Sequence, residues 1–215
     1  MRRFDALIVD FGGVLTTPLQ DAMVRFADEL GIELQDLVRV ALAAYSGEED
    51  SLVTDFETGK IEEEAFSIEF ARRLHDVTGV EVVPERLVDR IFSGLEAEED
   101  MFEAVLTTRR SGYKTALLSN SWGVGLYPMH RFPEMFDVVV ISGEVGMRKP
   151  DRDIFDHTVA ELAVPAERCI FVDDHPGHLK TAQDLGMATV LHRDPKRSLA
   201  ELSDLLELDL TPTDS

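Results

Sequence analysis

Four groups of polar residues in this chain of 215 residues stand where an apolar run ends or just before a predicted helix. They are Asp10, Ser119 with Asn120, Lys149, and Asp173 with Asp174. One carboxylate can attack phosphorus as a nucleophile, and two others can hold Mg²⁺. A lysine and a hydroxyl can neutralise and orient phosphoryl oxygens. The carboxylates alone would repel a phosphate, so this combination predicts phosphoryl transfer assisted by a metal ion.

Short apolar runs predict the strands that carry these groups. The runs cover residues 6–9, 115–118, 138–141, 170–172 and 189–191. Beyond about residue 104 they alternate with helical segments, which is typical of a parallel α/β sheet. Ligands bind beyond the carboxyl ends of the strands in such sheets, so we expect the four groups to converge in space. The predicted fold is a Rossmann-like α/β core.

A long helical segment separates the first predicted strand from the others. Its apolar residues recur at helical spacing, as in Leu19, Ala22, Met23, Phe26 and Leu30, and it shows no strand alternation. The chain is therefore predicted to leave the sheet, form a helical cap over its edge, and return. The expected divisions are a core of residues 1–15 and 104–207, a cap of residues 16–103, and a polar tail of residues 208–215, which is expected to fray from Asp209 onward.

The composition is that of a globular protein with an unusual charge. Hydrophobic residues make up 44% of the chain, charged residues 29%, and the net charge is −21. A surface this acidic repels nucleic acids and anionic membranes, so a small molecule is the expected partner. Cys169 is the single cysteine, and no apolar run approaches the ~20 residues of a membrane span. We expect a soluble, cytoplasmic protein.

Most of the negative charge lies in the predicted cap. Residues 16–103 contain 23 Asp and Glu against 7 Lys and Arg, whereas the rest of the chain contains 19 against 14. An acidic lid over a phosphate site is expected to disfavour polyanions and to tolerate small monophosphates.

Four short motifs carry a family resemblance. The runs VDFGGVL (residues 9–15), LSN (118–120), GMRKP (146–150) and FVDD (171–174) resemble, in order and spacing, the four motifs of the haloacid dehalogenase-like superfamily. The stretch 59–66 is similar to part of that family's helical cap. The resemblance covers nearly the whole chain and implies a Mg²⁺-dependent phosphohydrolase of a small phosphorylated metabolite.

The resemblance also implies a role for the acidic residues. Asp10 is the expected nucleophile, forms an aspartyl-phosphate, and is also a Mg²⁺ ligand. The backbone carbonyl of Gly12 is the expected second ligand. Asp174 is expected to bind the metal directly, with Asp173 supporting the site from behind.

The phosphate-binding residues follow from the same resemblance. Ser119 and the backbone amide of Asn120 are expected to hold phosphoryl oxygens. Lys149 is expected to stabilise charge on the attacking and transferred groups. Specificity is assigned to the cap and to the loop of residues 122–133, in which Trp122 either lines the substrate pocket or packs as an ordinary aromatic.

One position departs from the family pattern. Typical phosphatases of the family carry a second Asp two residues after the nucleophile, where this chain has Gly12. That Asp protonates the leaving group, and general acid–base catalysis contributes roughly 10²–10⁴-fold to the rate. A substrate whose leaving group needs little protonation, such as an anomeric sugar phosphate, would tolerate the glycine. His175 or His178 is a candidate to assist.

Two other functions remain open at this point. Dehalogenases of the family also lack the second Asp and work without metal, although the pair Asp173 and Asp174 favours a metal site. A catalytically weak phospho-ligand-binding or regulatory protein on the same fold is the other alternative, because a fold does not determine a function.

Overall fold

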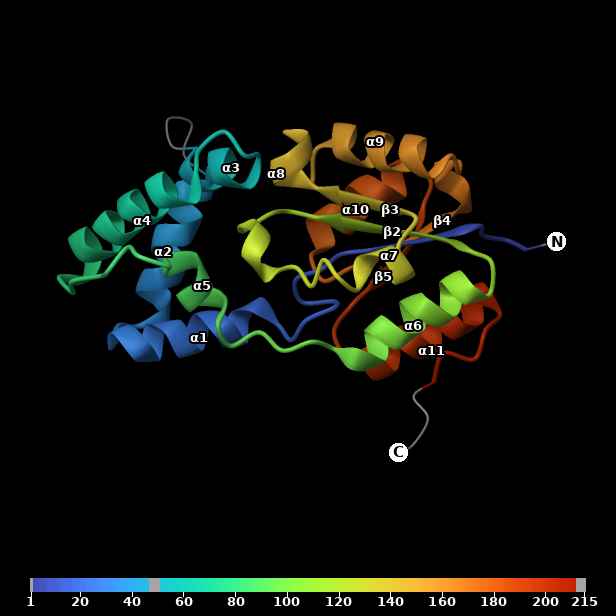
Figure 1. Ribbon diagram of the computed structural model, residues 1–215, viewed down its shortest axis with the longest axis horizontal. Coiled ribbons are helices and arrows are strands. Elements are labelled where there is room, and N and C mark those ends of the chain that lie inside the picture. Colours follow the sequence, from blue (N-terminus) through green and yellow to red (C-terminus); the bar gives the residue numbers. More distant parts are fainter. Residues whose placement is uncertain (1, 47–50, 212–215) are drawn as a thin grey trace.

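The computed structural model describes residues 2–46 and 51–211, and its centre is a five-stranded parallel sheet (Figure 1). The strand order is β3-β2-β1-β4-β5. The strands are β1 (Ala6–Val9), β2 (Lys114–Ser119), β3 (Val138–Ile141), β4 (Cys169–Asp173) and β5 (Ala188–Leu191). This sheet, with helices on both faces, confirms the predicted α/β fold class.

Helices cover the two faces of the sheet (Figure 1). On one face α6 (Glu99–Arg110) and α11 (Pro195–Leu206) enclose an apolar cluster that includes Phe102 and Leu202. On the other face α9 (Arg152–Leu162) and α10 (Pro176–Asp184) enclose a second cluster, which includes Phe155 and Leu179. The shorter elements of this part are η1 (Val124–Leu126), α7 (Phe132–Met135), α8 (Ser142–Val145) and η2 (Ala166–Arg168).

The central strand brings the predicted site residues to one level. Val9 in β1 lies opposite Leu117 in β2 and Val172 in β4. Asp10 follows the last residue of β1, and Asp173 is the last residue of β4, so the two aspartates lie side by side at the carboxyl edge of the sheet. All four residues of β1 are buried, as expected for a strand covered on both faces.

A separate group of helices forms the predicted cap, drawn in blue and green at the left of Figure 1. They are α1 (Leu19–Leu30), α2 (Leu34–Ser46), α3 (Leu52–Glu57), α4 (Glu63–Thr78) and α5 (Leu87–Phe92). These helices have their own apolar cluster, which contains Phe26, Phe66 and Phe70. Apolar residues at helical spacing are thus buried within the cap instead of against the sheet.

The chain passes between core and cap at two adjacent points, where Thr16 forms an antiparallel bridge with Ala97. The predicted boundary at residue 103 falls inside α6, whose Met101 and Phe102 are buried in the core cluster. Because one helix cannot belong to both packing units, we propose that the boundary lies near Ala97.

The prediction that the tail frays is wrong for Leu210 and the residues next to it. Leu210 is buried in the core cluster, and Leu208 packs against it. The backbone N–H of Leu210 donates to Ser203 Oγ of α11 over 3.1 Å, so the chain folds back onto that helix. Residues 212–215 of the predicted tail lie outside the described residues. Within the described part of the chain, no helix combines the length and apolarity needed to cross a membrane.

The end of α3 anchors the cap on the core. Glu57 is buried, and its Oε1 accepts a hydrogen bond of 3.0 Å from Nε1 of Trp122. Its Oε2 lies 2.8 Å from Nε of Arg148. Two residues later, Gly59 has a φ of +69° and faces the carbonyl oxygen of Gly143, which a Cβ would approach to 2.4 Å. Only glycine fits this close contact between cap and core.

Substituting Glu57 tests this anchor. Glu57→Ala leaves the largely buried guanidinium of Arg148 without that carboxylate, so we expect the free energy of unfolding to fall by about 3 kcal/mol. Trp122, the single tryptophan of the chain, loses its hydrogen bond, and its emission is expected to shift to the red as water enters the space that the carboxylate leaves. Thermal and urea unfolding followed by fluorescence measure both effects.

Glu85→Ala removes an exposed carboxylate of the cap and serves as the matched control. We expect its stability and emission to match those of the unmodified protein. Equal behaviour of the two variants would show that Glu57 does not anchor the cap.

Candidate active site

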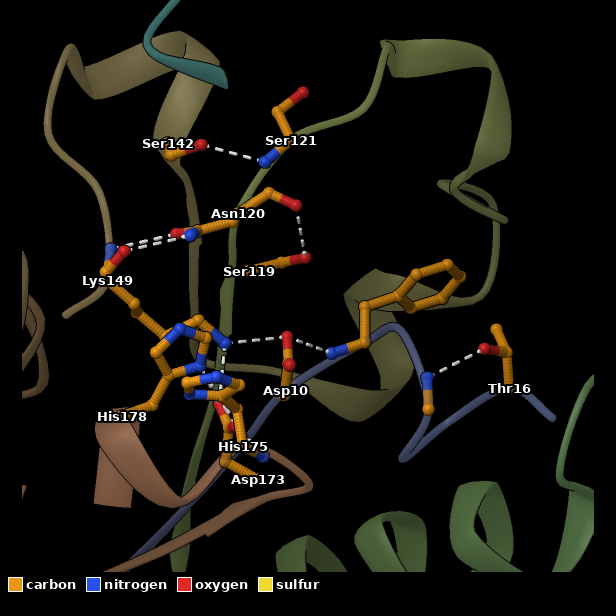
Figure 2. Close-up of polar contacts among 12 residues, drawn as sticks. Asp10, Thr16, Ser119, Asn120, Ser121, Ser142, Lys149, Asp173, His175 and His178 are labelled. Atoms are coloured by element: carbon orange, nitrogen blue, oxygen red, sulfur yellow. Dashed lines mark hydrogen bonds and ion pairs between the residues drawn. The ribbon is translucent and has the colours of Figure 1, made fainter. Parts of the chain in front are cut away.

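The four predicted groups meet at the carboxyl edge of the sheet, and a buried lysine lies at their centre (Figure 2). Lys149 Nζ is 2.8 Å from Asp10 Oδ1 and 2.7 Å from Asp173 Oδ2. The lysine and Asp173 are both 0% exposed, so water does not compensate their charges. The contacts join the ends of β1 and β4 to the loop that precedes α9.

The buried lysine keeps its charge because of its two carboxylate neighbours. Burial on its own lowers the pKa of Lys149, but the charges of Asp10 and Asp173 outweigh that effect and raise the pKa above its usual value. Burial likewise disfavours the charged form of Asp173. There Lys149 and His178 prevail and hold the pKa of that carboxyl well below its usual range.

The negative charge of Asp10 is less well compensated than that of Asp173. Its Oδ1 accepts a hydrogen bond of 2.7 Å from the backbone N–H of Phe11, which orients the carboxylate. Burial raises the pKa of Asp10 to about 8, against the attraction of Lys149, and the charge of Asp173 adds to the increase. Asp10 is thus a buried carboxylate that lacks enough positive charge around it.

Asp174 lies against Gly13, in the loop that follows Asp10. A Cβ on Gly13 would come within 2.5 Å of Asp174 Oδ2, so the carboxylate packs directly against that glycine, whose φ is +71°. Burial, followed by the charge of Asp173, raises the pKa of Asp174. Three carboxylates therefore share one ammonium group, and the donor set fits a hard divalent cation that prefers oxygen ligands.

His178 and His175 both support Asp173. Nδ1 of His178 in α10 is 3.0 Å from Asp173 Oδ1, and the backbone N–H of His175 donates to the same oxygen over 2.7 Å. The two imidazole rings lie 4.5 Å apart. Burial lowers the pKa of His178. Ligand atoms of Asp10, Asp173 and His178 lie within 4.8 Å of one another, whereas the predicted metal set has Asp174 and Gly12 in place of the histidine.

The second motif has a role that sequence reasoning missed. The Asn120 side chain holds the backbone of Lys149 at both polar atoms: Nδ2 donates to the carbonyl over 3.0 Å, and Oδ1 accepts from the N–H over 2.8 Å. Ser119 Oγ lies 3.0 Å from the hydroxyl of Tyr127, another residue that the sequence did not single out. Asn120 and Lys149 are 29 positions apart in the chain, and Ser119 and Tyr127 are 8 positions apart. The spacing of these residues in the sequence therefore does not predict either contact.

The glycine that departs from the family pattern is covered by the cap. Gly12 does not have a positive φ, so its backbone conformation admits a side chain. A Cβ there would lie 3.2 Å from Cδ2 of Leu19, the first residue of α1. A leucine methyl group thus occupies the space into which a side chain at position 12 would extend.

Comparisons with known proteins agree with this fold and these motifs. A family profile described as haloacid dehalogenase-like hydrolase matches residues 4–186. "Bifunctional epoxide hydrolase 2" of Sus scrofa is 30% identical over 223 residues, covering 97% of this chain and 40% of the relative. The chain thus spans about two-fifths of that protein's length. The "D-ribitol-5-phosphate phosphatase" of Bacteroides thetaiotaomicron is 27% identical, covering 85% of this chain and 89% of the relative.

Solved structures show the same fold. A predicted HAD-like family hydrolase from Porphyromonas gingivalis superimposes with a TM-score of 0.72 at 26% identity, covering 95% of this chain and 98% of that one. A HAD family enzyme from Bacteroides thetaiotaomicron, crystallised as a magnesium complex, superimposes with a TM-score of 0.65 at 21% identity, covering 89% and 94%. With its family profile, its strand order and its four motifs at one edge of the sheet, the chain belongs to the haloacid dehalogenase-like hydrolases.

Proposed function

We propose that this hydrolase is a Mg²⁺-dependent phosphatase that cleaves a small phosphomonoester through an aspartyl-phosphate on Asp10. The observation that carries the proposal is the charge balance at the sheet edge, where Asp10, Asp173 and Asp174 face the single ammonium of Lys149. A divalent cation would compensate the remaining negative charge. A relative named as a ribitol-phosphate phosphatase and a neighbour crystallised with magnesium support the same conclusion.

The proposed reaction has two steps, in which these residues have separate roles. Asp10 attacks phosphorus in line, the P–O bond to the leaving group breaks, and the carboxylate becomes phosphorylated. Water then attacks the same phosphorus, which releases phosphate and restores Asp10. Lys149 stabilises negative charge on the attacking and transferred oxygens, and Ser119 with the Asn120 amide holds phosphoryl oxygens.

The metal site draws on oxygen donors. Asp10, the carbonyl of Gly12 and Asp174 would hold Mg²⁺, while Asp173 stays with Lys149 and His178. When bound, the ion neutralises the carboxylates and polarises the phosphoryl group. Asn120 keeps the loop of Lys149 in place while the phosphoryl group is transferred.

Asp10→Asn tests the nucleophile. The amide cannot form the aspartyl-phosphate, so we expect Mg²⁺-dependent phosphate release to fall by more than about 10³-fold. The fold is expected to stay intact, because the amide oxygen can still accept from Lys149 and the charge of Asp173 remains beside it. Phosphate release from a panel of esters and thermal unfolding measure the two effects. Asp21→Asn, on an exposed position of α1, is the control and keeps full activity. Unchanged activity of Asp10→Asn would contradict the assignment.

Metal removal and Asp174→Asn test the cation site. We expect a chelator to abolish phosphate release and added Mg²⁺ to restore it. Asp174→Asn removes one ligand charge, so the Mg²⁺ concentration for half-maximal activity is expected to rise by about 10-fold or more. Asp184→Asn, an exposed carboxylate paired with Lys180, is the matched control.

The same assay separates the alternatives. Halide release from a 2-haloacid that survives chelation would identify a metal-independent dehalogenase. Tight phosphate binding without turnover of any ester would identify a phospho-ligand-binding protein.

A further inference from the structure

A small cavity lies beside the reaction centre, between cap and core. Its volume is about 40 Å³, which is room for about three water molecules. Gly12, Ser119 and Asn120 form its floor, and the other lining residues are Phe11, Leu19, Phe92, Leu95, Trp122, Leu126 and Tyr127. None of these lining residues, all in the described part of the chain, is acidic or basic.

A larger cavity continues from it toward the hinge. It measures about 280 Å³ and shares Phe11, Phe92, Leu95 and Leu126 with the first cavity. Its lining also includes Glu96, beside the Thr16–Ala97 bridge. Modest movement of the shared apolar side chains would join the two spaces. Beyond the phosphoryl group, a substrate would therefore meet a mainly apolar space of about 280 Å³.

The polar side chains that line the small cavity already have partners within the protein. Ser119 Oγ pairs with the hydroxyl of Tyr127, and the Asn120 side chain holds the backbone of Lys149. A sugar or polyol placed here would leave hydroxyl groups without partners, and each unpaired group would weaken binding by about 10-fold or more. The lining therefore selects against polar leaving groups.

Among the described residues that line this small cavity, none offers a carboxylic acid to the leaving group. Gly12 has no side chain, and a methyl group of Leu19 lies where a Cβ would make contact at 3.2 Å. Without protonation, the leaving oxygen departs as an anion, which is fast only when that anion is weakly basic. The substrate must therefore meet two separate requirements: its leaving group is apolar, and the anion that departs is weakly basic.

We propose that the site takes monophosphate esters whose leaving group is both apolar and weakly basic, with aryl monophosphates as the substrate class. This inference rests on the proposed phosphatase function. Asp10 attacks phosphorus, the aryl O–P bond breaks, and its electron pair leaves with the aryloxide, which takes a proton from solvent. Water then cleaves the aspartyl-phosphate, so the net products are a phenol and phosphate.

A matched pair of substrates tests the requirement for a weak base. Phenyl phosphate and cyclohexyl phosphate have leaving groups of similar size and apolarity but very different basicity. We expect kcat/KM to favour phenyl phosphate by at least about 100-fold, which is the contribution of a missing general acid. Glycerol phosphate and glucose 1-phosphate, whose leaving groups are polar, are expected to be poorer substrates than phenyl phosphate.

Variants at the cavity test the two requirements separately. Gly12→Asp combined with Leu19→Ala supplies an acid and the space for it, so the preference for phenyl over cyclohexyl phosphate is expected to shrink to about 10-fold or less. Leu19→Ala alone is the control and keeps the preference. Leu95→Asn makes the wall polar, and we expect it to lower kcat/KM for phenyl phosphate but not for acetyl phosphate, whose leaving group is small.

Several results would overturn the proposal. Equal rates for phenyl and cyclohexyl phosphate would show that the leaving group is protonated. A Tyr127→Phe variant that loses activity only toward cyclohexyl phosphate would also show that the leaving group is protonated. Preference for the polar esters would refute the aryl class and leave the proposed phosphatase function intact. Failure to hydrolyse any ester or acetyl phosphate with Mg²⁺ would refute the proposed function itself.

Discussion

The ammonium group of Lys149 lies fully buried between the carboxylates of Asp10 and Asp173, and the rest of the site depends on this contact. A buried charge is tolerated only when partners hold it closely, so both carboxylates must stay within hydrogen-bond distance. The register of β1 and β4 sets the separation of the two aspartates. The Asn120 side chain fixes the lysine's backbone from β2, and His178 holds Asp173 from behind. Three strands and one helix are therefore organised around a single cation.

The acidity of the chain does not extend to the small cavity beside the reaction centre. Residues 16–103 contain most of the excess negative charge, yet the cap residues that line this cavity are Leu19, Phe92 and Leu95. The cap presents uncharged side chains to this cavity, where a second group of carboxylates would raise the pKa of Asp10 further. The cap thus adds no carboxylate to this small cavity, whereas Glu62 and Glu63 line a neighbouring pocket with Ser121.

The sequence predicted what local pattern determines and missed what tertiary packing determines. Apolar runs ending in polar residues located the five strands and placed Asp10, Ser119 and Asp173 at their ends. Contacts between distant segments had no such signal: the Asn120 clamp, the burial of Glu57 against Trp122, and Leu19 over Gly12. The buried Leu210 was missed for a related reason, because one apolar residue in a polar tail has no periodicity.

Cap docking and phosphate binding involve neighbouring residues. Glu57 contacts Trp122 and Arg148, which lie two residues after Asn120 and one residue before Lys149. The small cavity beside the reaction centre measures about 40 Å³, so a phosphate ester fits only when the lining side chains or the cap helices shift. Because Glu57 at the end of α3 contacts both loops, a shift of α3 would move the residues that flank Asn120 and Lys149. The position of the cap and the geometry of the phosphate-binding residues are therefore coupled through Glu57.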